Sequence, residues 1–166
     1  MNRKVKLRSV VKLKRVASQL ELVQVFTIRI RVFVQEQRVP AEIELDTDDQ
    51  RAIHFLAITS GKAAGTARIV MKHGNAKIGR MAVLKSYRRK GVGARLLKHA
   101  VATAQKLRAG KIYLHAQVAA IDFYEGLGFR AVGKVFDEAG IPHRKMVFGV
   151  RLAAKNAKGA KKSRNL

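Results

Sequence analysis

Residues 77–118, KIGRMAVLKSYRRKGVGARLLKHAVATAQKLRAGKIYLHAQV, decide the fold. The aliphatic and β-branched run over 77–84 predicts a strand, and the similar run over 111–118 predicts another. Between the two, apolar residues recur at helical spacing from Leu96 until Gly110, a residue type common at helix ends. The stretch therefore predicts a strand–loop–helix–strand unit whose loop carries three consecutive cations and two glycines.

The loop before the predicted helix is suited to binding an anion. Free backbone N–H groups and the positive end of the helix dipole converge at a helix N-terminus. Gly91 and Gly93 leave the backbone open to a ligand, and the cations of 88–90 add charge. The loop does not match the Walker A pattern, and it fails the Gly-x-Gly-x-x-Gly fingerprint because Leu96 occupies the last position. The open interpretations are a phosphate site of another kind, a nucleic-acid contact and a solvated loop.

The rest of the chain predicts one domain, because no internal repeat and no Pro/Gly/Ser-rich linker interrupts it. Ser18 and Glu21 form a capping box that favours a helix at the start of an otherwise ambiguous apolar segment. We expect strands over 9–16, 54–59, 65–72, 129–136 and 143–152, helices over 18–37 and 119–129, and turns over 60–64 and 137–142. The resulting order β-α-β-β-β-α-β-α-β-β predicts an α/β domain with a mixed sheet.

The composition is that of a strongly basic globular protein without cysteine. The 166 residues are 48% hydrophobic and carry a net charge of +24. Seven Lys/Arg lie in 1–15 and six in 151–166, with no acidic residue in either segment. Such a charge favours a polyanionic partner, although a merely solubilising surface is an equal alternative. No apolar run reaches the length of a membrane span, and the N-terminus lacks a signal-peptide pattern, so we expect a cytoplasmic protein.

The segment over 88–94, RRKGVGA, resembles the Arg/Gln-x-x-Gly-x-Gly/Ala signature of the GNAT superfamily of acyl-CoA N-acyltransferases. The stretch over 112–129, IYLHAQVAAIDFYEGLGF, is similar to the fifth strand and short helix of that family, and the similarity extends over about 9–150, most closely to bacterial members without an assigned substrate. The resemblance implies a GNAT-type α/β fold, with a mixed central sheet flanked by helices. We expect a domain over 1–152 that includes a basic extension at 1–8, followed by a basic tail over 153–166 that is disordered.

The same resemblance implies acetyl-CoA as the donor and assigns site residues. Tyr124 would act as the general acid for the leaving thiolate, although packing against the sheet is its alternative role. Gln117 stands where many relatives carry Asn, which leaves its contact with the cofactor open. The residues implied to bind the cofactor are Met81, Ala82 and Val83 for the pantetheine arm, Arg88, Arg89, Lys90, Gly91, Val92, Gly93 and Ala94 for the pyrophosphate, and Gln117 and Phe123. No metal is expected.

A general base is harder to assign from the sequence. His143, near the turn between the last two predicted strands, leads the candidates. Glu138, His115, His54 and Glu36 are alternatives, as is a chain of water molecules leading to a distant carboxylate.

Five of the eleven acidic residues fall between 42 and 49. The preferred interpretation is a solvated loop that balances nearby arginines, and the alternative is a site that attracts a cationic amine. A calcium loop is excluded because the central glycine and the terminal glutamate of that motif are missing.

Two functions from different classes follow from these observations. The first is transfer of an acetyl group from acetyl-CoA to a primary amine, of a small molecule or of a protein, by direct attack. The second is a basic nucleic-acid-binding module on a GNAT-like fold without turnover, although aromatic residues make up only 6% of the chain and no stacking-rich RNA motif is present. An enzyme could also bind nucleic acid weakly through its basic termini. By analogy with the family a homodimer is conceivable, and no membrane partner is expected.

Overall fold

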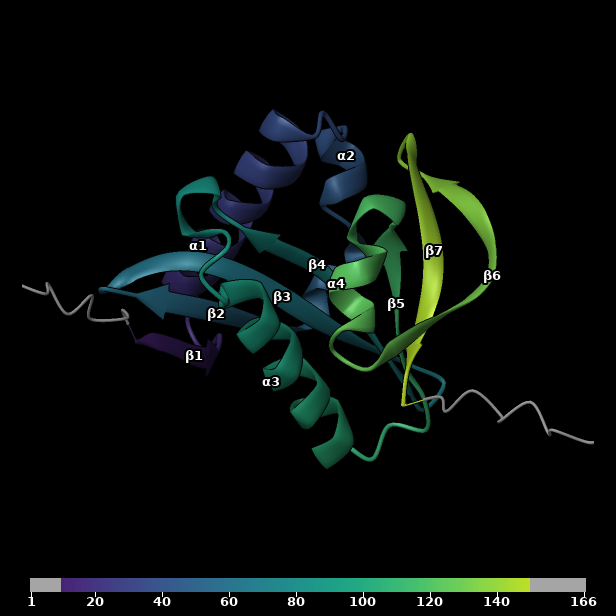
Figure 1. Ribbon diagram of the computed structural model, residues 1–166. Helices are drawn as coiled ribbons and strands as arrows, with labels where there is room; N and C mark the ends of the chain where they lie inside the picture. Colours follow the sequence, from purple (N-terminus) through teal and green to yellow (C-terminus); the bar gives the residue numbers. More distant parts are fainter. Residues whose placement is uncertain (1–9, 150–166) are drawn as a thin grey trace, which may run out of the picture.

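A computed structural model describes residues 10–149 as a seven-stranded mixed sheet in the order β1-β2-β3-β4-β5-β7-β6 (Figure 1). The strands are β1 (Val11–Arg15), β2 (Ile53–Thr59), β3 (Lys62–Lys72), β4 (Asn75–Val83), β5 (Ile112–Gln117), β6 (Phe129–Glu138) and β7 (Ile141–Phe148). All neighbouring pairs are antiparallel except β4 and β5, which the helix between them makes parallel. The predicted α/β fold with a mixed sheet is therefore confirmed.

Helices cover both faces of the sheet (Figure 1). They are α1 (Gln19–Arg29), the π-helical η1 (Ile30–Glu36), α2 (Ala41–Glu44), η2 (Thr47–Gln50), η3 (Lys85–Tyr87), α3 (Val92–Lys106), η4 (Val118–Ala120) and α4 (Ile121–Glu125). Alternate residues of β2 point to opposite faces. Phe55 and Ala57 pack into the core under α3, whereas Leu56 joins Val25 and Ile28 under α1.

The strands β4 and β5 separate soon after they begin. They pair only at Ala76 with Ile112 and at Lys77 with Tyr113. Beyond this point β4 continues along β3 while β5 continues along β7. The register of β3 and β4 also shifts between Thr66 and Arg68, and Arg80 has a φ of +50°. The sheet therefore opens between the carboxyl ends of β4 and β5, and this opening positions the candidate site.

Several predicted boundaries were wrong. The turns expected over 60–64 and 137–142 are two-residue turns at Ser60–Gly61 and Ala139–Gly140. All four of these residues have positive φ, as the tight turns of twisted hairpins require. The helix expected to reach Gly110 ends at Lys106.

The segments between 18 and 50 also differ from expectation. The helix expected over 18–37 is α-helical only to Arg29 and continues as a π-helix. The short helices α2 and η2 were not predicted. The basic extension over 1–8, the tail over 153–166 and the end of the last predicted strand lie outside the described residues.

Candidate active site

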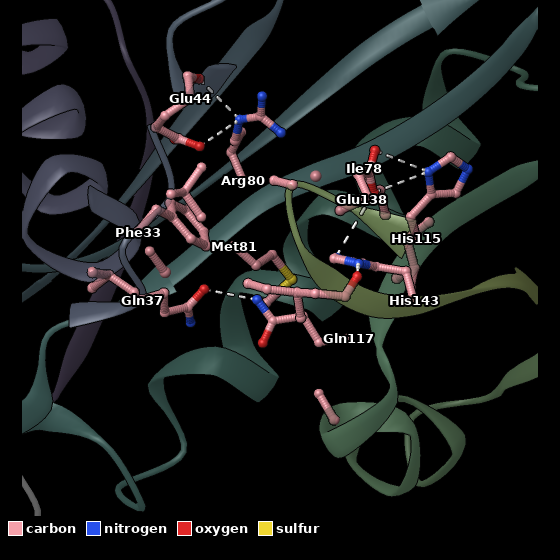
Figure 2. A pocket seen from close by; sticks show the side chains of 18 of the residues that line it. Phe33, Gln37, Glu44, Ile78, Arg80, Met81, His115, Gln117, Glu138 and His143 are labelled. Carbon is pink, nitrogen blue, oxygen red and sulfur yellow. Dashed lines mark hydrogen bonds and ion pairs between the residues drawn. The ribbon is translucent and has the colours of Figure 1, made fainter. Parts of the chain in front are cut away.

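A cavity of about 300 Å³ lies where β4 and β5 diverge (Figure 2). One wall comes from η1 and α2 and contains Phe33, Val39 and Ile43. The opposite wall comes from β5, α4 and the β6–β7 hairpin and carries several titratable side chains, while Glu44 of α2 adds a carboxylate to the first wall. An apolar wall that faces a few converging polar groups is the usual construction of a small-molecule site.

Tyr124 lines this cavity from α4 and is half-buried. Its ring makes edge contacts with Phe123 at 5.0 Å and with Phe129 at 6.1 Å between centroids, so the packing role considered from the sequence is part of its environment. Burial raises the pKa of Tyr124 to about 12. The phenol therefore keeps its proton at neutral pH, as a proton donor must.

Glu138 lies between two histidines on the same wall (Figure 2). Its carboxylate is 3.4 Å from His115 Nδ1 and 3.8 Å from His143 Nε2. The hydrogen bond from His115 lowers the pKa of Glu138 to about 2 although partial burial opposes the shift. His143 Nδ1 lies 2.7 Å from the carbonyl oxygen of Ile141. Because a carbonyl only accepts, Nδ1 carries a hydrogen, and Nε2 is the ring nitrogen that faces the Glu138 carboxylate.

Two other candidate bases lie away from the cavity. His54 is buried between Phe26, at 6.1 Å between ring centroids, and the carbonyl of Asp49, at 3.0 Å. Glu36 forms an ion pair with Arg88 at 2.8 Å. Neither residue lines the cavity, so their contacts are structural.

The predicted phosphate loop precedes α3 and keeps its backbone accessible. Gly91 is the N-cap of α3 with a φ of +80°, and nothing lies within 4 Å of where a Cβ would stand. A Cβ on Gly93 would meet the ring of Phe123 at 3.5 Å, which places α4 beside this helix end. Arg89 and Lys90 are exposed. Lys90 Nζ donates to the carbonyl of Ser86 at 2.8 Å, in the same loop.

Arg88 has a different environment from the other two cations of the loop. Its Nε donates to the carbonyl of Val83 at 2.8 Å, and a terminal nitrogen pairs with Glu36. The contact shows that the Val83 carbonyl faces the open side of β4 rather than β3. Arg88 therefore links the end of β4 to η1, beside the cavity that it also lines.

The remaining predicted cofactor contacts are spread around the opening. Met81, Ala82 and Val83 all line the cavity; Met81 and Val83 are half-buried, and the side chain of Ala82 is buried against the α1 side of the sheet. Gln117, at the end of β5, donates from Nε2 to Gln37 Oε1 at 2.8 Å. This hydrogen bond crosses from β5 to the segment that follows η1 (Figure 2).

The acidic cluster of 42–49 is largely a buried ion-pair network. Glu44 pairs with Arg29 at 2.6 Å, Asp49 pairs with Arg29 at 2.7 Å, and Asp46 pairs with Arg68 at 2.7 Å. The side chain of Arg29 is fully buried, and that of Glu44 is 4% exposed. The expectation of a solvated loop was therefore wrong for Glu44, although arginines balance the charge as expected. Paired in this way, the cluster is not a free site for an amine.

Comparisons with known proteins agree with this geometry. A family model described as an acetyltransferase (GNAT) domain matches residues 16–149. The chain belongs to the GNAT acetyltransferase family. The Bacillus subtilis protein called uncharacterized N-acetyltransferase YjcF is 39% identical over 128 residues, 76% of this chain and 91% of that protein. Escherichia coli ElaA is 32% identical over 135 residues, 76% of this chain and 88% of ElaA.

Solved GNAT structures share the fold. The crystal structure of Escherichia coli ElaA has a TM-score of 0.76 at 28% identity and covers 84% of this chain and 99% of its own. An acyl-CoA N-acyltransferase from Pseudomonas aeruginosa has a TM-score of 0.74 at 29% identity, covering 84% of this chain and 99% of its own. These likenesses confirm the predicted GNAT fold. Within residues 10–149, no helix is long and apolar enough to cross a membrane, and no group of three or more potential ligands could hold a metal ion.

Three polar residues that line the cavity of this GNAT domain were not predicted from the sequence. They are Gln37, Lys77 and Arg80. Lys77 and Arg80 are placed by the divergence of β4 from β5 and by the shift in register, which depend on pairings distant in sequence. Gln37 is placed by the π-helical turn that closes at its own N–H. No local sequence pattern predicts the divergence of the strands or the π-helical turn.

Proposed function

We propose that this protein transfers an acetyl group from acetyl-CoA to a primary amine. The observation that carries the proposal is the position of Tyr124 and His143 on one wall of the cavity between β4 and β5, close to the N-terminus of α3. A protonated phenol and an imidazole that faces a carboxylate can serve as the acid and the base in aminolysis of a thioester.

The residues at the opening are compatible with acetyl-CoA as the donor. The free N–H groups of the first turn of α3, together with Arg89 and Lys90, would hold the pyrophosphate. Met81 and Val83 on the unpaired side of β4 would hold the pantetheine arm. Phe123 and Gln117 would border it, although the hydrogen bond between Gln117 and Gln37 would have to yield if the arm passes between them.

The side chains of the cavity would move the two protons of the reaction. Acetyl-CoA, when bound, supplies the thioester carbonyl that the neutral amine attacks. His143 Nε2 would take the proton that the amine loses, and the ionised Glu138 would stabilise the imidazolium. Tyr124 would give its proton to the departing sulfur. Direct attack requires no nucleophile from the enzyme, which is compatible with a chain without cysteine. The acceptor would be a small amine or an amino group of a protein.

A thermal-shift titration with acetyl-CoA tests the donor site. At about one hundred times Kd the ligand stabilises the fold by about 2.7 kcal/mol, which raises the Tm of a chain of this size by about 5–10 °C. The double variant Arg89→Ala/Lys90→Ala should need a higher acetyl-CoA concentration for the same shift. Arg130→Ala/Lys134→Ala, two exposed cations of β6, should titrate like the parent chain. An unmoved Tm at millimolar acetyl-CoA would refute the donor site.

A further inference from the structure

The acidic residues of this chain are confined to two segments. All eleven lie within 21–49 and 122–138. The 72 residues from 50 to 121 contain fifteen Lys/Arg and no acidic residue. Carboxylates from the other segments pair with five of these cations, but none of those five belongs to α3 or to the loop that follows it.

The outer side of α3 is basic and lacks large apolar residues. Its apolar side is buried against the sheet through Val92, Leu96, Leu97, Ala100, Val101 and Ala104. The exposed positions opposite are Arg95, Lys98, Ala102, Gln105 and Lys106. Arg95 and Lys106 lie eleven residues apart, which corresponds to about 16 Å along the helix axis.

The basic surface continues beside this row and beyond its carboxyl end. Arg15 of β1 pairs in register with Phe55, whose ring contacts His99 of α3 at 5.1 Å, so Arg15 lies on the α3 side of the sheet. Arg108 and Lys111 are exposed in the loop after the helix. We call Arg15, Arg95, Lys98, Lys106, Arg108 and Lys111 the α3 basic face. Within residues 10–149 none of the six forms an ion pair with a carboxylate.

The chain leaves this part of the molecule at both ends of the α3 basic face (Figure 1). Near the start of the described residues, the carbonyl of Val11 accepts a hydrogen bond from Arg95 at 3.1 Å. Near the other end, Val147 pairs with Tyr113, two residues after Lys111. The segments 1–9 and 150–166, which follow in sequence, contribute four and six Lys/Arg and no acidic residue. The sequence therefore adds ten Lys/Arg beyond the two limits of the described residues.

We infer that the α3 basic face binds the phosphate backbone of nucleic acid, independently of base sequence. Cations spaced along one rigid helix match a polymer of regularly spaced phosphates, and base readout is not needed for such binding. A membrane-surface helix would instead present apolar side chains to the lipid, and those of α3 are buried. The inference is independent of the acetyl-transfer reaction, because the cavity lies between β4 and β5.

Fluorescence anisotropy with the full chain tests the inference. The probes are a labelled 20-nucleotide RNA of mixed sequence and a labelled 20-base-pair DNA duplex, each titrated from 50 to 200 mM salt. Lys98→Gln/Lys106→Gln should weaken binding at every salt concentration. For two lost phosphate contacts, the slope of log K against log salt should become shallower by about 1.4 on RNA and about 1.8 on the duplex. The matched control Arg130→Gln/Lys134→Gln removes the same charge from the edge strand β6, outside the α3 basic face, and should leave both slopes unchanged.

Three results would overturn the inference. The first is no measurable binding of either probe at 50 mM salt. The second is an equal loss of affinity in both double variants, which would indicate diffuse attraction by net charge. The third is tighter binding to vesicles containing 30% phosphatidylserine than to either nucleic acid. Lys98→Gln/Lys106→Gln should keep the Tm of the parent chain and its shift with acetyl-CoA. Nucleic-acid binding and acetyl-CoA binding can therefore be tested independently of each other.

Discussion

Tyr124 contacts both the aromatic core and the cavity. Its ring packs between Phe123 and Phe129, while the residue also borders the cavity between β4 and β5. Among the described residues, none forms a hydrogen bond with its hydroxyl. A partly buried phenol that borders the cavity without a protein partner is free to interact with a bound ligand.

The variant Tyr124→Phe removes the hydroxyl group and keeps the aromatic ring. Because phenylalanine preserves the packing, Tm and acetyl-CoA affinity should stay close to those of the parent chain. The kcat of acetyl transfer should fall about 10²–10⁴-fold, the usual effect of a positioned acid. The parent chain should also show no loss of activity from ionisation of Tyr124 below about pH 10, since burial raises its pKa to about 12. An unchanged kcat would remove the general-acid role.

Gly91 has a conformation that other residues adopt at a cost. Its φ of +80° lies in the left-handed region, and no atom fills the space that a side chain would enter. Gly91→Ala should therefore destabilise the fold by about 1–2 kcal/mol through backbone strain alone. It should also raise the Kd for acetyl-CoA, because the new methyl group lies at the loop that would hold the pyrophosphate. Gly61→Ala, with a similar φ of +72° in a distant hairpin turn, is the matched control and should lose stability only.

At the scale of elements, the buried ion pairs attach α2 and η2 to the sheet. Arg29 of α1 contacts Glu44 of α2 and Asp49 of η2, and Arg80 of β4 contacts Glu44 at 3.1 Å. These short helices are too small to be stable alone. Their charges therefore fix the segment that contributes Ile43 and Glu44 to the cavity wall.

Arg29→Leu should lower the free energy of unfolding by about 3–5 kcal/mol, because it removes the buried guanidinium that pairs with both Glu44 and Asp49 and leaves each carboxylate with one arginine. Arg51→Gln, which breaks an exposed pair with Asp48, should cost less than about 1 kcal/mol. Urea denaturation of both variants measures the difference. Equal losses would contradict a structural role for the buried network.

The same network predicts how stability depends on pH. Burial alone would raise the pKa of Asp49, but hydrogen bonds from Arg29 and Arg68 lower it below its ordinary value. A carboxylate with a lowered pKa contributes stability above its unfolded pKa of about 4, and the contribution is lost as the pH falls through the folded value. Chemical denaturation between pH 3 and 6 should therefore show that the free energy of unfolding falls more steeply with decreasing pH in the parent chain than in Asp49→Asn.

At the scale of the whole molecule, local patterns predicted the elements, while long-range pairings determined the site. The helical spacing after Leu96 predicted α3, and the two glycines predicted an open backbone at its start, although not the positive φ of Gly91. Glu138 lies beside His115 and His143 because of the register of β5, β6 and β7. The sequence could therefore name these residues as separate candidates but could not predict that they lie together. The arginine partners of Glu44, Asp46 and Asp49 lie 15 to 36 residues away, and no local spacing connects them.

Release of free coenzyme A in the presence of an amine panel tests the proposed acetyl transfer most directly. A thiol reagent reports only the product, because the chain contains no cysteine. With polyamines, aminosugars, aminoglycosides and peptides as acceptors, we expect thiol release that depends on the amine and falls at least 100-fold in Tyr124→Phe. Release that is absent with every amine, or equal in the parent chain and Tyr124→Phe, would contradict the assignment of this cavity as the site of acetyl transfer.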